Sequence, residues 1–409
     1  MKQRLPIALL IPAALAAAIF AGAAASSAAF TSDSCGTSGS GADGGSGTFG
    51  SGTECPPPPP PPYPTVPDRL YGVAGAASND VWAVGLEPTS SLIMHWDGSS
   101  WTTSFTEPIG YFRAVSAPAT NDVWAVGGTK WFGGSQTLAE HWNGTSWTQV
   151  TTPTPGSGVL NGVAATSASN AWAVGFVGPG LGTPASATEP LIDHWDGSNW
   201  TEQTFADPAD GGQFAATAAI SADDAWAVGQ TGSVSEGTGQ TSMIYHWDGS
   251  SWTRVPSPNA AGSSNMLSGV TAISADDVWA VGQTLASDGQ DKSLTMHWNG
   301  STWTIVSSPN PTGDTGLQAV AGASANDVWA VGLTNPTHCS SGGPKCDTIA
   351  MHWDGSAWTV VPAANPAHSY LNALLGIAVI NGDSHDVWAV GTTDYESTLF
   401  THWDGTNWH

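Results

Sequence analysis

Two short tryptophan-bearing strings recur through most of this 409-residue chain. Val-Trp-Ala-Val-Gly is first seen at residues 81–85 and His-Trp-Asp-Gly-Ser-x-Trp-Thr at residues 95–102; both recur with substitutions, seven times each, always in that order. The Trp of the first string returns every 42 to 59 residues, from Trp82 to Trp388. Self-similarity with a period of this size is typical of repeat architectures, whose neighbouring units bury a shared core.

The second string carries a hairpin signal. Asp-Gly or Asn-Gly between two short apolar runs favours a tight turn, because glycine accepts the positive φ that such turns need. The connection is either a two-residue turn at Asp-Gly or a four-residue loop that pairs Trp96 with Trp101. Side chains alternate along a strand, so in both registers Trp96 and Trp101 share one face and His95 points to the other.

Two further segments complete each repeat. A run of small residues, such as residues 162–165, leads through a short Ser-Ala-x-Asp turn into the Val-Trp string. One repeat therefore predicts four antiparallel strands, and seven repeats predict an all-β fold, a seven-bladed β-propeller of four-stranded antiparallel blades. An open β-solenoid is the alternative, and it would have shorter and more uniform repeats.

The repeated aromatic and histidine residues have a structural explanation. Twenty-one of the 22 tryptophans occupy the stations of Trp82, Trp96 and Trp101, where we expect them to pack blade against blade. The seven histidines at the station of His95 would lie on a wide ring, one in each blade, so they would not converge on a metal ion. We expect each to make a hydrogen bond inside its own blade.

The N-terminal part differs in composition from the repeats. Residues 1–29 combine a basic start, an apolar segment and small residues, which indicates a secretory signal peptide, with an uncleaved anchor as the alternative. Residues 30–67 are rich in Gly and Ser and then in Pro, which predicts a disordered stalk. Residues 68–409 should form the propeller. We therefore expect a secreted, extracellular protein without a transmembrane segment in its mature chain.

The seventh repeat stops at Trp408-His409, so its fourth strand is truncated. In complete repeats this strand continues further, as in residues 252–256. Residues 64–67 resemble the end of such a strand, and we expect them to help complete the seventh blade and close the ring.

Four cysteines in a secreted chain predict two disulfide bonds. Proximity favours a pair between Cys339 and Cys346, which would close a short loop in the sixth repeat. It also favours a pair between Cys35 and Cys55, which would close part of the stalk. The other pairings stay open.

Charge narrows the range of partners. The chain has 8 Lys and Arg against 33 Asp and Glu, so nucleic acid and anionic membranes are unsuitable partners. Asp recurs in the first turn of six repeats and in the Asp-Gly turn of five, where turn chemistry explains it; calcium is the alternative, although no Asp-x-Asp-x-Asp loop occurs. Neither Gly-x-Ser-x-Gly nor His-Glu-x-x-His occurs either. We predict no cofactor, metal ligands or catalytic residues.

Across residues 69–409 the strings Asp-Val-Trp-Ala-Val-Gly and His-Trp-Asp-Gly-Ser-x-Trp-Thr resemble the tryptophan-rich propeller repeats of secreted bacterial proteins, notably of actinobacteria. Such repeats are described as kelch-like or galactose-oxidase-like. The resemblance implies the fold and does not extend to galactose oxidase activity, because that enzyme uses a Tyr–Cys cross-linked copper site and Cys339 and Cys346 are expected to pair. Bacterial and invertebrate propeller lectins are similar in architecture, which implies sugar binding as an alternative.

Recognition should lie on one face of the propeller. Both short turns of every blade emerge on the same face, and the longer connections, which vary between repeats, emerge on the other. Variable loops on a rigid scaffold commonly carry binding sites. One such loop contains Lys130, Trp131 and Phe132, and Trp131 is the tryptophan outside the three packing stations. It either contacts a ligand or caps its own blade.

The function that follows is a non-catalytic binding module, presented on a stalk, whose variable loops recognise a glycan or an extracellular protein. We expect a monomer. One alternative is a carbohydrate-binding lectin of the cell surface. Another is a secreted polysaccharide lyase or glycoside hydrolase with its site at the mouth of the propeller channel.

Overall fold

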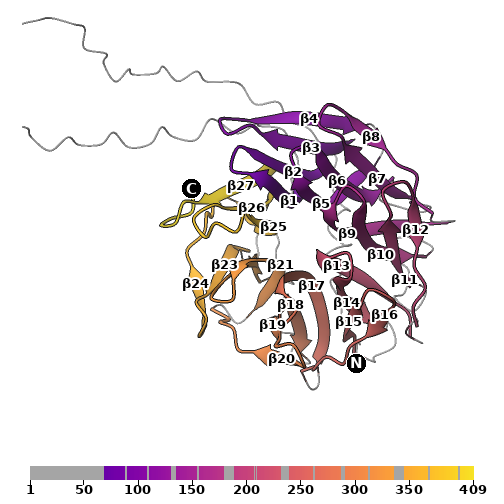
Figure 1. Cartoon of the computed structure of the whole chain (residues 1–409). Coiled ribbons are helices and arrows are strands. Elements are labelled where there is room, and N and C mark those ends of the chain that lie inside the picture. Colours follow the sequence, from indigo (N-terminus) through magenta and orange to yellow (C-terminus); the bar gives the residue numbers. More distant parts are fainter. Residues whose placement is uncertain are drawn as a thin grey trace, which may run out of the picture.

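The computed structural model shows seven β-sheets around a central axis, with the blades in chain order and the seventh beside the first (Figure 1). No helix occurs among the described residues. This confirms the predicted all-β, seven-bladed propeller of four-stranded antiparallel blades. The structure describes residues 69–409 except 88–89, 108–109, 130–134, 154–155, 179–187, 207, 209, 232–238, 261–262, 287–290, 312–313, 336–344, 367–368 and 395–396.

Each blade is a simple antiparallel meander whose first strand lies innermost. The small-residue runs form the innermost strands because little space is available near the axis. These strands are β1 (Arg69–Ala77), β5 (Tyr111–Ala119), β9 (Gly158–Ser167), β13 (Gly212–Ser221), β17 (Ser263–Ser274), β21 (Thr315–Ser324) and β25 (Asn372–Val379). The Val-Trp strings form the second strands: β2 (Asp80–Leu86), β6 (Asp122–Gly128), β10 (Asn170–Val177), β14 (Asp224–Thr231), β18 (Asp277–Ala286), β22 (Asp327–Thr334) and β26 (Val387–Thr393).

The His-Trp strings supply the two outer strands of each blade. The third strands are β3 (Ser91–Trp96), β7 (Thr137–Trp142), β11 (Glu189–Trp195), β15 (Thr241–Trp247), β19 (Asp291–Trp298), β23 (Thr348–Trp353) and β27 (Ser397–Trp403). The outermost strands are β4 (Trp101–Glu107), β8 (Trp147–Gln149), β12 (Trp200–Glu202), β16 (Trp252–Arg254), β20 (Trp303–Val306) and β24 (Trp358–Val361).

The hairpin between the third and fourth strands has the four-residue register. Trp96 pairs directly with Trp101, so the two-residue alternative is wrong. The Asp97 carboxylate accepts backbone N–H hydrogen bonds from Ser99 at 2.8 Å and Ser100 at 2.9 Å, while Gly98 supplies the positive φ of 91°. Hydrogen bonds from Ser99 and Ser100 hold the pKa of Asp97 at about 2. The acid at this turn is thus explained by turn chemistry.

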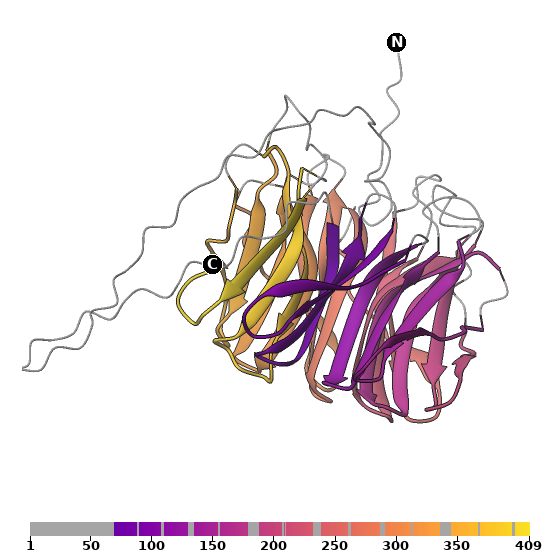
Figure 2. The same cartoon turned by 90° about the horizontal axis from the view of Figure 1, so that it is seen from above.

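The strands run between the two faces of the disc (Figure 2). In the first blade the turns at residues 78–79 and 97–100 lie on one face, here named the turn face. Because consecutive strands are antiparallel, the connections after β2 and after β4 lie on the opposite face, named the loop face. This arrangement is the one predicted from the repeat.

Three tryptophans meet at every boundary between blades. Between the fourth and fifth blades, the Trp226 side chain is 1% exposed, and its ring centroid lies 5.2 Å from that of Trp298 and 5.5 Å from that of Trp303. Offset and edge-on aromatic contacts of this kind are favourable beyond the area they bury. Equivalent clusters occupy the other boundaries, which confirms that the repeated tryptophans pack blade against blade.

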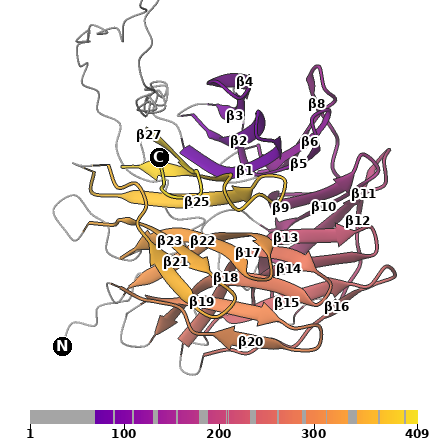
Figure 3. The ribbon, with the colours of Figure 1, turned by 60° about the vertical axis from the view of Figure 1, so that its left-hand side comes forward.

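The same contact closes the ring. Trp388 of the seventh blade lies 5.3 Å, between ring centroids, from both Trp96 and Trp101 of the first (Figure 3 shows β25 beside β1). The seventh sheet has three strands, and Trp408 continues it with a single bridge to Trp403, so the truncated fourth strand is confirmed. Residues 64–67, predicted to complete this blade, lie outside the described residues.

Several sequence predictions concern segments that the structure does not describe. The signal peptide at 1–29, the stalk at 30–67 and Cys35, Cys55 and Cys339 are among them, so they stay predictions. Cys346 is buried, and its backbone forms an isolated parallel β-bridge with Leu371. Within the described residues, no helix has the length and apolar character needed to cross a membrane.

Replacing Trp226 with Ala should lower the free energy of unfolding by about 3–5 kcal/mol, because it opens a cavity at a closed blade boundary. Chemical denaturation of the full chain measures this. Val360, whose side chain is 43% exposed on β24, provides the control, and Val360→Ala should change stability by less than about 0.5 kcal/mol. Equal effects of the two substitutions would contradict the role given to the cluster.

Candidate functional site

The repeated histidines are internal parts of the blades. In the first blade the His95 Nε2–H donates to Asp80 Oδ1 at 2.8 Å, and the imidazole stacks on Trp82 with centroids 4.1 Å apart. All seven histidines make the equivalent bond inside their own blade, six to an aspartate and one to an asparagine, which confirms the structural interpretation. Among the described residues, no group of three or more His, Cys, Asp or Glu is placed to hold a metal ion.

Blade three is the exception to this pattern. Its histidine, His194, bonds to the amide oxygen of Asn170 at 2.8 Å, where the other blades have an aspartate. A neutral amide gives no charge to balance an imidazolium. Burial therefore lowers the pKa of His194 below its ordinary 6.5, although Asp196 acts in the opposite direction.

The station before the histidine is apolar in most blades but carries a buried acid in two. Asp193 is 0% exposed on β11, and neither carboxylate oxygen has a hydrogen-bond partner among the described residues. Burial, with the nearby charge of Glu202, raises its pKa to about 7. Glu140 at the same station of β7 behaves alike, since burial and the charge of Glu107 raise its pKa to about 7. Neither acid lines the central cavity described next.

A β-bulge interrupts the innermost strand of every blade at the same place. In β1, Leu70 pairs with Gly85 and Gly72 with Val84, so the register shifts by one residue and Tyr71 is the extra residue of the bulge. A bulge re-aims the side chain of its extra residue. The seven extra residues, named the bulge ring, are Tyr71, Arg113, Asn161, Ala215, Ser268, Gln318 and Leu375.

The glycine that ends each Val-Trp-Ala-Val-Gly string makes room for this bulge. A Cβ atom on Gly85 would lie 1.7 Å from the Arg69 carbonyl oxygen, a distance no real side chain tolerates. The other six glycines of the string have the same close approach, at 1.9 to 2.0 Å. A repeated glycine thus fixes the backbone that directs the variable residue toward the axis.

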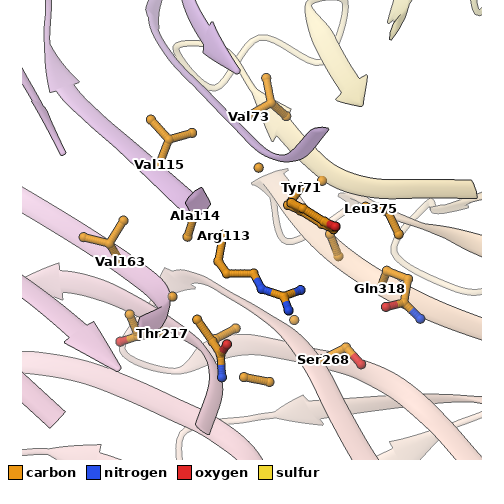
Figure 4. Close-up of a pocket in the computed structure, with 18 of the residues that line it drawn as sticks. Tyr71, Val73, Arg113, Ala114, Val115, Val163, Thr217, Ser268, Gln318 and Leu375 are labelled. Carbon is orange, nitrogen blue, oxygen red and sulfur yellow. The ribbon is translucent and has the colours of Figure 1, made fainter. Parts of the chain in front are cut away.

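The bulge ring lines a cavity of about 250 Å³ at the central channel (Figure 4). Its residues lie near the beginning of their strands, so the cavity lies toward the loop face. Tyr111, Arg69, Phe176 and Gln213 add to the lining from neighbouring positions. The cavity therefore has aromatic, cationic, amide and hydroxyl groups on walls of small residues.

Arg113 occupies the middle of this cavity. Its guanidinium carbon lies 4.9 Å from the ring centroid of Tyr71 and 5.2 Å from that of Tyr111, distances at which a cation is attracted to an aromatic face. Burial raises the pKa of Tyr111 above its ordinary value, which keeps this phenol protonated. On the other wall the Asn161 amide donates to the Phe214 carbonyl at 2.8 Å, which ties blade three to blade four.

The residues predicted for recognition lie elsewhere. Lys130, Trp131 and Phe132 are outside the described residues, so their role stays a prediction; the flanking Gly128 and Ser135 lie beside Tyr111. Sequence reasoning missed the bulge ring. The signal was present, because each innermost strand has Leu or Phe, then one variable residue, then Gly or Ala and a β-branched residue.

Comparison with known proteins supports the fold. No protein-family model and no curated protein matches the sequence. A polysaccharide lyase of family PL25, an ulvan lyase bound to -[GlcA(1-4)Rha3S]-, resembles the structure with TM-score 0.56 at 8% identity, over 84% of this chain and 96% of the lyase. YCF48 from Cyanidioschyzon merolae gives 0.52 at 16% identity, over 84% and 97%. YCF48 bound to D1 peptide gives 0.51 at 15%, over 83% and 92%.

At these identities the similarity shows the fold alone. The protein is a seven-bladed β-propeller, and its solved structural neighbours are β-propeller proteins. What they bind or cleave is a property of those proteins.

Replacing Asn170 with Asp should raise the pKa of His194, because a carboxylate at hydrogen-bond distance favours the imidazolium. In the wild type the folded pKa lies below 6.5, so stability present above that pH is lost as the pH falls below it. The substitution should reduce that loss. Histidine NMR titration measures the pKa of His194. Asn407→Asp in the seventh blade is the control. An unchanged His194 pKa in Asn170→Asp would refute the explanation.

Replacing Asp193 with Asn should stabilise the protein at pH 8. The folded pKa of about 7 lies above the ordinary 3.8, so its contribution to stability is fully present below pH 3.8 and is lost as the pH rises to about 7. The neutral amide should recover on the order of 3 kcal/mol at pH 8 and nothing near pH 3. Denaturation at both pH values tests this, and a gain of equal size at both would show that charge is not the cause.

Proposed function

We propose that this protein is a non-catalytic binding module that takes its ligand into the mouth of the central channel, with the bulge ring as the recognition surface. One observation carries the proposal. The same backbone bulge in all seven blades directs seven side chains of differing chemistry into one cavity. Packing of the propeller needs no such variety, whereas recognition of a specific ligand does.

The size of the cavity limits what it can hold. At about 250 Å³ it is slightly smaller than the ~300–1,000 Å³ typical of pockets for drug-sized ligands. One sugar unit or one amino-acid side chain of a longer chain fits this scale. Structural neighbours bound to a D1 peptide or to -[GlcA(1-4)Rha3S]- make either class reasonable for a propeller.

The chemistry of the lining favours binding over hydrolysis. Most glycoside hydrolases use a pair of carboxyl groups on either side of the scissile bond. None of the described residues that line the cavity is Asp, Glu or His. We therefore place lectin-like binding ahead of hydrolysis in this proposal. A turnover assay on any glycan that binds tests the order.

The setting of the module belongs to the same proposal. Residues 1–29 would direct the chain out of the cell, and residues 30–67 would hold the propeller away from its point of attachment. The extracellular partner would then meet the loop face, where the cavity lies. The net formal charge of −25 keeps such a module soluble.

The test is a binding screen of the full chain on one array of neutral and acidic oligosaccharides and tetrapeptides. Tyr71→Ala and Gln318→Ala should each weaken the binding found by about tenfold or more, which corresponds to ~1.4 kcal/mol. Both side chains are partly exposed in the cavity, so thermal stability should change little.

Ile305→Ala, at a 45% exposed residue on the outermost strand β20, is the matched control and should leave binding unchanged. Trp131→Ala separates the loop prediction from the channel. Loss of binding in Trp131→Ala alone, with both channel variants like the wild type, would move the ligand to that loop and refute the channel proposal.

A further inference from the structure

We propose that the channel mouth recognises a uronic acid unit of an acidic polysaccharide, with the sugar carboxylate on Arg113. The inference rests on the proposed function and adds the chemical class of the ligand. It follows from three properties of the cavity: its charge, the way Arg113 is held, and the polarity of the wall that faces it.

The charge of the cavity is opposite to that of the protein. Of the described basic residues, two line the cavity, and none of its described lining residues is acidic. The formal net charge of the whole chain is −25. Interactions beyond about 10 Å are largely screened at ordinary ionic strength, so the local charge governs a bound group. Arg69 and Arg113 therefore make this site suited to an anion.

Arg113 is oriented by its neighbours. Tyr71 and Tyr111 lie against the guanidinium, at 4.9 and 5.2 Å from their ring centroids, and Figure 4 shows the group reaching into the middle of the channel beside Tyr71. An oriented guanidinium loses little entropy when it binds a planar carboxylate through two parallel hydrogen bonds. The arrangement is therefore better matched to a carboxylate than a mobile lysine would be.

The wall that faces Arg113 is neutral and rich in hydrogen-bonding groups. Figure 4 shows Gln318 and Ser268 on that side, and Asn161 and Gln213 also line the cavity. Amides and hydroxyls both donate and accept, which matches the several hydroxyls of a sugar ring. A peptide side chain carrying one carboxylate would leave most of these groups without a partner.

Apolar surface completes the site. The Leu375 side chain and the Tyr71 ring come from adjacent blades, the seventh and the first, and both border the cavity. Sugar rings combine a polar edge with C–H faces that pack on aromatic and aliphatic surfaces. A carboxylate, a hydroxylated edge and a C–H face therefore each find a matching surface in one cavity, and a hexuronate has all three.

Isothermal titration of the full chain with tetragalacturonate and with neutral galactotetraose tests the inference. The wild type should bind the uronate at least about tenfold more tightly, because hydrogen bonds between charged groups are stronger than neutral ones. Arg113→Gln should abolish that preference. Arg254→Gln, which removes an exposed arginine from β16, should retain it and is the matched control.

Equal affinity for the two saccharides, no binding of either at millimolar concentration, or an unchanged preference in Arg113→Gln would each overturn the inference. Tighter binding of an acidic tetrapeptide than of the uronate would overturn it too. If Arg113→Gln does not fold, the salt dependence of the wild type decides, since only uronate affinity should fall with added NaCl.

A different result would contradict the proposed function. Saccharide binding that survives Tyr71→Ala and Gln318→Ala would place the site outside the channel, whatever the charge of the sugar. Binding of neutral galactotetraose that is lost in those two variants would keep the channel site and remove only the uronate assignment.

Discussion

The contact between one tryptophan of a blade and two tryptophans of the next is the interaction on which the other features depend. It recurs at every boundary, including the one between Trp388 and the first blade, so each blade is held from both sides. In the first blade the His95 ring stacks on Trp82, and its Nε2–H donates to Asp80. These two contacts join the second and third strands of the blade.

The fold could be predicted because it is encoded in this repetition. The period, the Asp-Gly turn and the three tryptophan stations gave the blade count, the strand order and the two faces. The sequence does not decide the turn register, because both registers put Trp96 and Trp101 on one face; hydrogen bonds to Asp97 decide between them. Periodicity carries no information of that kind.

The candidate site is harder to predict because recognition commonly lies in variable loops, and the sequence has such loops. The variable residues that the structure brings together are instead inside a strand. An alternating pattern places every second side chain on one face, and a bulge breaks that rule by one residue. Tyr71 and Gln318 therefore face the axis although regular alternation does not direct them there. The paired register of Leu70 and Gly85 shows the break, together with the glycine that the bulge requires.

This separation between scaffold and bulge ring has a functional consequence. On either side of the bulge, Leu70 and Val73 are buried in the core, whereas Tyr71 is partly exposed in the cavity. Substitution at the bulge therefore changes the lining of the cavity and leaves the blade boundaries intact. The side chain at this position differs between blades, from the methyl group of Ala215 to the guanidinium of Arg113, although the blades otherwise repeat closely. Each blade contributes one bulge side chain to the same small volume, so the chemistry of the cavity can vary on a fold whose stability is fixed elsewhere. Under the proposed function, this variation is what sets the binding specificity.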